Sequence, residues 1–196
     1  MDVNDVILVG NLEAPLRYAY NEGKKRIFFG YLLVERLSGT VDHIPITIEE
    51  KHVSSHMTSN NVKVRGYIIG KTRNDKYNFS VRIYQWDIPK EDSNEKTNRA
   101  LMSGKICSDC IVKECKGNKI LYNVLIASTI NENIKSYVPA FAWNNLGEYI
   151  SKLKQGKRIF VDARIQSRRF IKTAADGTNE EKEVYELLIV KLRKKK

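Results

Sequence analysis

The sequence lacks any run of about 20 apolar residues, the length that a helix needs to cross a bilayer. Its start, from Met1 to Asp5, also lacks the basic and apolar regions of a secretory signal peptide. The chain has only three cysteines, all within residues 107–115, which are too few and too closely spaced for a framework of disulfides. We therefore expect a cytoplasmic protein with reduced thiols and no membrane partner.

Motifs of the common catalytic and metal sites are missing as well. No phosphate-binding Gly-Lys-Ser/Thr loop, nucleophile elbow or pair of catalytic carboxylates can be found. Cys107, Cys110 and Cys115 have no matched second pair or nearby histidine to complete a tetrahedral zinc site. His52 and His56 are spaced by four, but they lack the intervening glutamate of a metalloprotease helix. We expect neither an enzyme nor a bound cofactor or metal ion.

Positive charge, in contrast, is in excess. The 34 Lys and Arg residues outnumber the 23 Asp and Glu residues, which gives a net charge of +11 and a pI near 9.5. Five of these charges lie in the last six residues, where a charged run is usually only solvated, and the remaining +6 belongs to the body of the chain. The excess favours an anionic partner such as nucleic acid or an acidic membrane surface.

The chain repeats itself. Gly10 and Gly104 end similar apolar runs 94 positions apart, and Pro45 and Pro139 lie at the same offset. Residues 62–68 match residues 159–165 at a slightly larger offset, as a short insertion in the second copy would produce. We therefore predict two domains, residues 1–89 and 99–192, joined by a polar linker at 90–98 and followed by a basic tail at 193–196.

Each copy predicts the same order of elements: strand, long strand, strand, short helix, strand, strand. Residues 158–165 show the alternation of a half-buried strand, with the apolar side chains at 159, 161, 163 and 165 facing a core. Leu146, Ile150 and Leu153 are spaced as on a helix that Asn144 or Asn145 can cap and that Gly156 can end. Val53 and Met57 keep a weak trace of this pattern in the first copy.

This order is that of the OB-fold. The fold class we predict is all-β with one short helix per domain, as two tandem five-stranded OB barrels. Residues 173–183, which contain Asp176-Gly177 and three glutamates, are interpreted as the loop between the last two strands of the second barrel.

Three segments of the second copy carry a family resemblance. They are Tyr-Val-Pro-Ala-Phe-Ala-Trp at 137–143, Leu-Lys-Gln-Gly at 153–156 and Arg-Ile-Gln-Ser-Arg-Arg-Phe at 164–170. In this order they resemble the bacterial single-stranded DNA-binding protein family, over nearly all of residues 99–192. The first copy is more loosely similar, and the whole resembles the two-OB form of the family. The resemblance implies a protein of a bacterium, its phage or its plasmid that binds single-stranded DNA.

A sequence-tolerant binder of single strands needs cations for the phosphates and aromatic rings for the bases. By the resemblance, Tyr137, Trp143 and Phe170 are the stacking residues of the second copy. The cations around Phe170 are Arg164, Arg168, Arg169 and Lys172. If Ile165 faces the core, strand alternation places Arg164, Arg168 and Phe170 on the outer face. The alternative is that these aromatic residues belong to the core.

The first copy has a different set of residues at these positions. His43, Glu49 and Arg73 stand where the second copy has Tyr137, Trp143 and Phe170. Its candidate contacts are the cations Lys63, Arg65, Lys71 and Arg73, with Tyr67 and Tyr77 as stacking groups. We expect this domain to contact DNA weakly or to serve as an assembly surface. The run Lys24-Lys25-Arg26 is either a solvated turn or the border of the nucleic-acid groove.

Two functions are therefore compared: protection of single-stranded DNA in replication, recombination or mobile-element transfer, and a structural adaptor with incidental nucleic-acid binding. Single-stranded RNA stays an alternative ligand, because base stacking is largely indifferent to the 2′-hydroxyl. The resemblance implies four OB domains per assembly, which a homodimer would supply, and the two copies could also pair within one chain. The basic C-terminus departs from the acidic tail of many family members, so the role of that tail in recruiting partners does not carry over.

Overall fold

A computed structural model describes residues 1–53, 61–73, 76–89, 97–132, 134–173 and 177–193. The first domain contains β1 (Asn4–Leu12), β2 (Arg17–Glu22), β3 (Lys25–Glu35), β4 (Val41–Glu49), the 3₁₀ turn η1 (Glu50–His52), β5 (Val62–Arg73) and β6 (Lys76–Asp87). The second contains β7 (Asn98–Ile106), β8 (Ile111–Cys115), β9 (Lys119–Asn131), β10 (Ile134–Trp143), α1 (Asn144–Ser151), β11 (Arg158–Thr173) and β12 (Asn179–Leu192).

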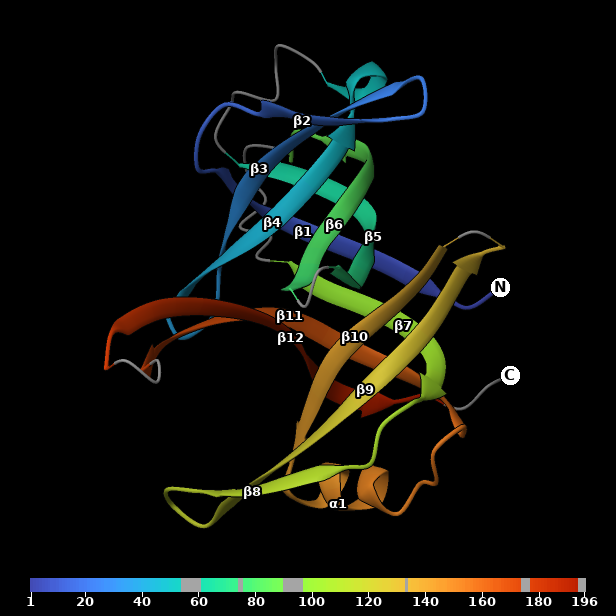
Figure 1. Cartoon of the computed structure of the whole chain (residues 1–196), viewed down its shortest axis with the longest axis vertical. Coiled ribbons are helices and arrows are strands. Elements are labelled where there is room, and N and C mark those ends of the chain that lie inside the picture. Colours follow the sequence, from blue (N-terminus) through green and yellow to red (C-terminus); the bar gives the residue numbers. More distant parts are fainter. Residues whose placement is uncertain (54–60, 74–75, 90–96, 133, 174–176, 194–196) are drawn as a thin grey trace.

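Both domains are OB barrels, as predicted. In the first, β1 pairs with β5 and also with β3, which closes the barrel, and β4 and β6 form its parallel pair. In the second, β7 pairs with both β11 and β9, and β10 and β12 form the corresponding parallel pair. The first OB strand is broken in each copy: β1 and β2 are separate strands that both pair with β3, and β7 and β8 are separate strands that both pair with β9 (Figure 1).

The predicted alternation on β11 is confirmed. Val161, Ala163 and Ile165 are buried, and so is Ile159 at the start of the strand. They pack with Met102, Ile126, Val138 and Leu187 in the second barrel, while Leu8, Leu32, Ile44, Ile46 and Ile68 occupy the equivalent interior of the first. Burial of branched aliphatic side chains on the inner face of every long strand stabilises both barrels.

The helix α1 forms where it was predicted, but its ends differ. Asn144 adopts a left-handed φ of +49°, and its side chain accepts a hydrogen bond from the Ile120 N–H (3.0 Å) instead of capping the helix. The helix ends at Ser151, before Gly156, whose N–H donates to the Ile106 carbonyl. In the first domain the described counterpart is only η1, and Met57 and His56 lie outside the described residues.

The loop predicted at 173–183 is shorter than expected. Strand β11 runs to Thr173 and β12 starts at Asn179, with Thr173 opposite Asn179 in the register. Acidic residues on β12 stand next to basic ones, as in the pair Arg169–Glu183, so the charge that suggested a loop instead supports cross-strand pairs. The predicted linker also ends earlier, because Asn98 already begins β7, whereas residues 90–96 lie outside the described part of the chain.

The two barrels join along β1 and β7, which pair antiparallel (Figure 1). Val6 lies opposite Ala100, and these residues are equivalent in the two copies at the offset of 94, so a pseudo-twofold axis passes between them. An amide clamp is repeated on both sides. Asn4 exchanges two hydrogen bonds of 2.9 Å with the backbone of Ile68, and Asn98 exchanges bonds of 2.7 and 2.9 Å with that of Ile165.

Next to this axis the two copies carry the same ion pair with its charges reversed. Asp5 accepts hydrogen bonds of 2.8 and 3.0 Å from the Arg65 guanidinium on β5. At the equivalent positions of the second copy, Arg99 donates to Asp162 on β11 at 3.3 and 3.1 Å. Positions 5 and 99 therefore hold opposite charges on the two sides of the pseudo-twofold axis.

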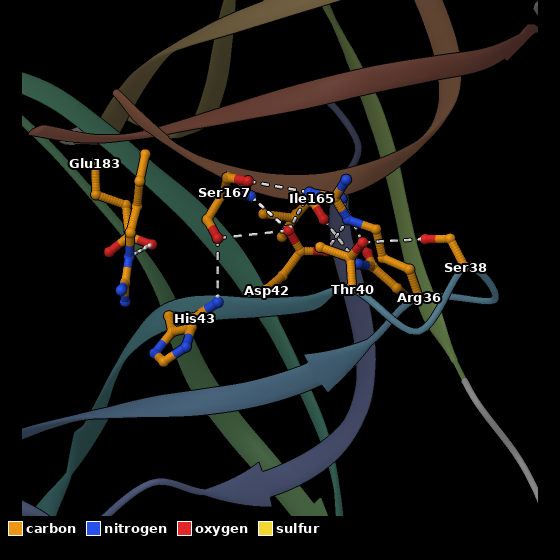
Figure 2. A network of polar contacts seen from close by, with 10 residues as sticks. Arg36, Ser38, Thr40, Asp42, His43, Ile165, Ser167 and Glu183 are labelled. Carbon is orange, nitrogen blue, oxygen red and sulfur yellow. Dashed lines mark hydrogen bonds and ion pairs between the residues drawn. The ribbon is translucent and has the colours of Figure 1, made fainter. Parts of the chain in front are cut away.

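Each domain also extends a hairpin onto the other. The β11–β12 hairpin reaches β4, where the Ser167 N–H donates to Asp42 Oδ1 (2.7 Å) and the His43 N–H donates to Ser167 Oγ (3.1 Å) (Figure 2). Asp42 is fully buried, and Arg36 binds both of its carboxylate oxygens and the Ser167 carbonyl. These contacts hold the second domain's hairpin against the first barrel.

The reciprocal contact joins the β5–β6 hairpin to β10. The Gly70 N–H donates to Ser136 Oγ (2.8 Å), and the Tyr77 hydroxyl donates to the Tyr137 carbonyl (2.9 Å). A Cβ at position 70 would stand 2.4 Å from the Tyr137 carbonyl oxygen, so the close approach of the two backbones requires glycine. The domain junction thus includes one strand pair and two hairpin contacts related by the pseudo-twofold axis, and Asp2 adds hydrogen bonds to Thr129 of β9.

Candidate nucleic-acid interface

The outer face of β10 carries two exposed aromatic side chains. Tyr137 is 42% exposed and Trp143 is 36% exposed, whereas their neighbours Ser136, Val138 and Ala142 point inward and are buried. The Trp143 ring lies edge-on to Phe141, with centroids 6.2 Å apart, and Phe141 is buried. Tyr137 and Trp143 therefore lie on the surface and are not core residues, so their rings are free to stack on bases.

Strand β11 presents the third predicted aromatic residue together with a cation. The Arg168 guanidinium lies over the half-buried Phe170 ring, 5.3 Å from its centroid. Arg164 is exposed on the same face of the strand and has no ion pair among the described residues. Arg168 is also 3.8 Å from the half-buried Glu186, a long contact that is weak because the Arg168 side chain is exposed to water. This face offers a ring and two cations to a ligand.

One of the predicted cations, Arg169, is placed differently. Arg169 lies on the opposite face of β11 from Arg168, beside Glu183 at 3.4 Å. Glu183 in turn accepts a hydrogen bond from the Tyr185 hydroxyl, and the Tyr185 ring stacks on Phe79 of the first domain (5.4 Å, 20°). Arg169 thus turns toward the domain junction. Lys172 lies on β11 opposite Glu180.

The candidate residues of the first domain are mostly engaged within the molecule. Arg65 is paired with Asp5, and the half-buried Tyr67 ring stacks on Tyr84 at 6.4 Å. The Tyr77 hydroxyl contacts the Tyr137 carbonyl, and burial raises the pKa of Tyr77, which keeps the donated proton in place. Lys63 is half-buried on β5.

The remaining candidate positions of the first copy lie on β4 and β5. Lys71 is exposed and has no ion pair among the described residues, and Arg73 lies at the end of β5 opposite Lys76. His43 contacts Glu13 at 3.1 Å, and Glu49 lies between Lys25 and Lys51 at 3.3 Å from each. His43 offers only a small imidazole ring held against Glu13, and Glu49 carries no ring.

The structure brings some candidates together across the junction. Tyr77 of the first domain touches Tyr137 of the second, and the β11–β12 hairpin that carries Arg168 and Phe170 lies against β4 of the first. The predicted sites of the two copies are therefore neighbours on one continuous molecule. Separate inspection of each copy could not reveal this arrangement, because every such contact joins residues far apart in the sequence.

A group of aromatic and basic side chains on β2 and β3 was not among the predicted site residues. It consists of Arg17, Tyr18, Tyr20, Arg26, Phe28, Phe29 and Tyr31. The signal was present in the sequence as an alternation of rings and cations over residues 17–31, but among these positions only Phe28 has an aromatic counterpart in the second copy, Tyr122.

Other kinds of site find no support in the described residues. No three His, Cys, Asp or Glu side chains of the described part gather as metal ligands, and the three cysteines there are free thiols. Burial raises the pKa of Cys107 and of Cys110, which disfavours reactive thiolates at those positions. A search of the described helices finds none long and apolar enough to span a bilayer.

Comparisons with known proteins point in one direction. Residues 97–193 match the model of the single-strand binding protein family. The wild-type single-stranded DNA binding protein of Thermus aquaticus has a similar structure, with a TM-score of 0.74, 16% identity, and coverage of 100% of this chain and 94% of that chain. A deletion mutant of the same protein gives a TM-score of 0.69 at 17% identity, with 99% and 95% coverage. No curated protein sequence matches this chain.

Proposed function

Because this chain belongs, through its second domain, to the single-strand binding protein family, we propose that it binds and protects single-stranded DNA in a sequence-tolerant manner, without catalysing a reaction. The surface of β10 and β11 is the observation that carries this proposal. Tyr137 and Trp143 are exposed on β10, and Arg168 lies over the Phe170 ring on β11. The setting is replication, recombination or the transfer of a mobile element.

Each feature of this surface matches one feature of a single strand. The rings of Tyr137, Trp143 and Phe170 offer flat faces on which unpaired bases can stack, a contact that every base can make. Arg164 and Arg168 stand beside them and can approach the phosphates. Stacking excludes paired bases, so the affinity for single strands should exceed that for duplex DNA. Each phosphate contact should steepen the log-log salt dependence by about 0.7.

Substitution of the rings tests the proposal. Each stacked base contributes roughly 1–3 kcal/mol, so Tyr137→Ala with Phe170→Ala should weaken binding to oligo-dT by about 2–6 kcal/mol. Tyr149→Ala removes a more exposed ring on α1 and serves as the control, with affinity unchanged. All variants must unfold near the temperature of the parent protein. Normal binding by the folded double variant would contradict the assignment of this surface.

The proposal includes single-stranded RNA as a second ligand. Among the contacts described above, none is specific for a 2′-hydroxyl or for its absence, so RNA of matched length should bind through the same rings. Competition of labelled oligo-dT by oligo-dT, oligo-U and duplex DNA measures the three affinities. Equal affinity for duplex and single strand would overturn the proposal, because no stacking surface could then be responsible.

We further propose that two chains associate, giving the four OB domains per assembly that the family resemblance implies. The edges of β1 and β7 already pair with each other inside the chain, so a second chain would contact another surface of this one. Sedimentation equilibrium should give twice the chain mass of 22.6 kDa. A mass of one chain at micromolar concentration would contradict this part of the proposal.

A further inference from the structure

The strand that carries Tyr137 is supported by both domains. Strand β10 pairs with β9 over its whole length, whereas its pairing with β12 includes, in the described part of the chain, Ala140 and Phe141 alone. Tyr137 itself meets the β5–β6 hairpin of the first domain, where the Tyr77 hydroxyl donates to the Tyr137 carbonyl (2.9 Å). The backbone that presents this exposed ring is therefore held by a residue of the other domain.

The pseudo-twofold axis shows which part of this contact is repeated. Residues 62–68 correspond to residues 159–165, so Gly70, two residues further along β5, corresponds to Ser167 on β11. The Gly70 N–H donates to Ser136 Oγ (2.8 Å). In the same way the Ser167 N–H donates to Asp42 Oδ1 (2.7 Å), and position 42 is the counterpart of position 136 at the offset of 94. This hydrogen bond therefore docks each hairpin onto the other domain.

The next residue of each strand is bound differently. His43, the counterpart of Tyr137, donates its backbone N–H to Ser167 Oγ (3.1 Å). Gly70 has no such side chain, and a Cβ there would overlap both the Tyr77 hydroxyl and the Tyr137 carbonyl oxygen. Glycine at position 70 thus leaves the space through which Tyr77 reaches that carbonyl. The departure from symmetry lies on the side whose strand carries the exposed ring.

The Tyr77 hydroxyl is not the only anchor of its hairpin. The buried Phe79, two residues further along β6, stacks its ring on Tyr185 of β12 (5.4 Å, 20°). This ring contact and the hydrogen bond to Ser136 hold the hairpin against the second domain. Burial raises the pKa of Tyr77, so its hydroxyl keeps its proton at neutral pH and remains a donor. What the hydroxyl adds is a fixed position for the Tyr137 backbone.

We propose that Tyr77 is a positioning residue for the nucleic-acid surface of the second domain, because its hydrogen bond fixes the strand from which the Tyr137 ring projects. The inference rests on the proposed function and deepens it, since it gives the first domain a role in binding that requires no contact with the ligand. A ring held in place before binding loses less conformational freedom when a base stacks on it, and this strengthens binding. The first domain thus raises the affinity of a surface that belongs to the second.

The variant Tyr77→Phe tests the hydrogen bond by itself. It removes the hydroxyl and keeps the ring, which is 38% exposed, so any direct stacking by Tyr77 is preserved. We expect binding to oligo-dT to weaken about threefold to fivefold, which is part of the roughly tenfold loss that Tyr137→Ala should cause by removing a stacked ring. The slope of the log-log salt dependence should stay that of the parent protein, because no phosphate contact is lost.

A double-mutant cycle shows whether Tyr77 acts through Tyr137. In the Tyr137→Ala background, Tyr77→Phe should change the affinity by less than about 1.5-fold, because the ring that it positions is absent. The matched control is Tyr84→Phe, which removes a hydroxyl that donates to Asp5 Oδ1 (3.0 Å) on β1 and should leave the affinity for oligo-dT unchanged. Thermal unfolding sets a temperature at which the parent protein and all variants are folded, and binding is measured there.

Normal binding by Tyr77→Phe, beside weakened binding by Tyr137→Ala, would overturn the inference and leave the proposed function intact. Equal losses from Tyr77→Phe in the two backgrounds would also overturn it, because they would indicate a direct contact with DNA or a general loss of stability. A loss in Tyr84→Phe as large as that in Tyr77→Phe would have the same meaning. Unchanged binding by Tyr137→Ala would instead contradict the proposed surface itself, and the inference with it.

Discussion

Asp5 and Arg99 occupy the same position in the two domains, 94 residues apart, and carry opposite charges. Each is paired with an oppositely charged residue on the neighbouring strand, Arg65 for Asp5 and Asp162 for Arg99. If two first domains paired through β1, Asp5 would meet its own copy near the axis, and two second domains would likewise bring two Arg99 side chains together. Opposite charges at these positions favour the pairing of unlike domains that the chain displays.

Reversing one charge should therefore destabilise the junction. Asp5→Arg places a cation beside both Arg65 and Arg99, and we expect a lower unfolding temperature than for Asp5→Asn, which only removes the pair. Reversing all four residues, by Asp5→Arg, Arg65→Asp, Arg99→Asp and Asp162→Arg, restores opposite charges in both interstrand pairs but places a cation beside Arg193, so it should recover part of the loss. Thermal unfolding at low and high salt measures the effect. A fourfold variant no more stable than Asp5→Arg would contradict the prediction.

These ion pairs should also make stability depend on acid pH. Hydrogen bonds from Arg65 hold the pKa of Asp5 below its usual 3.8. Burial alone would raise the pKa of Asp162, but hydrogen bonds from Arg99 and Arg193 outweigh it and lower the pKa below 3.8. Because both folded-state pKa values lie below the unfolded value, their contribution is complete above that value. It is lost as the pH falls through the folded pKa values.

Urea unfolding at pH 6 and pH 3 tests this sign. The variant Asp5→Asn/Asp162→Asn should lose less stability between the two pH values than the parent protein does. Asp109→Asn, at an exposed residue with no ion pair among those described, is the control and should follow the parent. An unchanged pH dependence in the double variant would show that these carboxylates do not contribute.

The contact between β4 and β11 should depend strongly on Asp42. Its carboxylate is fully buried and accepts hydrogen bonds from Arg36 and from the Ser167 N–H, so Asp42→Ala leaves the Arg36 guanidinium without its partner (Figure 2). Removing one member of a buried ion pair typically costs about 3–5 kcal/mol. Ser167→Ala removes only the hydroxyl that His43 binds, at a cost of about 1 kcal/mol. Urea unfolding measures both changes, and equal losses would contradict the assigned roles.

Much of the fold could be predicted because its signals are local or repeated. The offset of 94 fixed the two copies, and the alternation of Val161, Ala163 and Ile165 assigned the inner face of β11 correctly. The same alternation predicts that Arg169 faces away from Arg168. The prediction missed this because it grouped the cations around Phe170 by their closeness in sequence. The extent of β12 was missed because glutamates opposite cations resemble a solvated loop when the register is unknown.

The junction could not be predicted from either copy alone. Asp42 contacts Ser167, and Gly70 contacts Tyr137, only because the barrels pair through β1 and β7. No local sequence pattern encodes that geometry. The rings of the β2–β3 hairpin were overlooked for another reason. Candidate residues of the first copy were sought on β4, β5 and β6, whereas these rings lie on β2 and β3.

The C-terminal cations should contribute to binding and to folding separately. Arg193 is held by an ion pair with Asp162 (2.6 Å), and its backbone N–H donates to the Phe160 carbonyl (2.7 Å), so it belongs to the folded domain. Deletion of residues 194–196 removes three lysines, which should reduce the log-log salt slope of oligo-dT binding by at most about 2 units, since each phosphate contact contributes roughly 0.7. The free energy of unfolding should stay unchanged.

Deletion of residues 193–196 should give the same loss of slope or slightly more, together with a loss of stability of about 1 kcal/mol, because the backbone hydrogen bond to Phe160 disappears. Loss of all binding in the shorter deletion would assign the DNA contact to the tail and contradict the placement of the site on the two barrels.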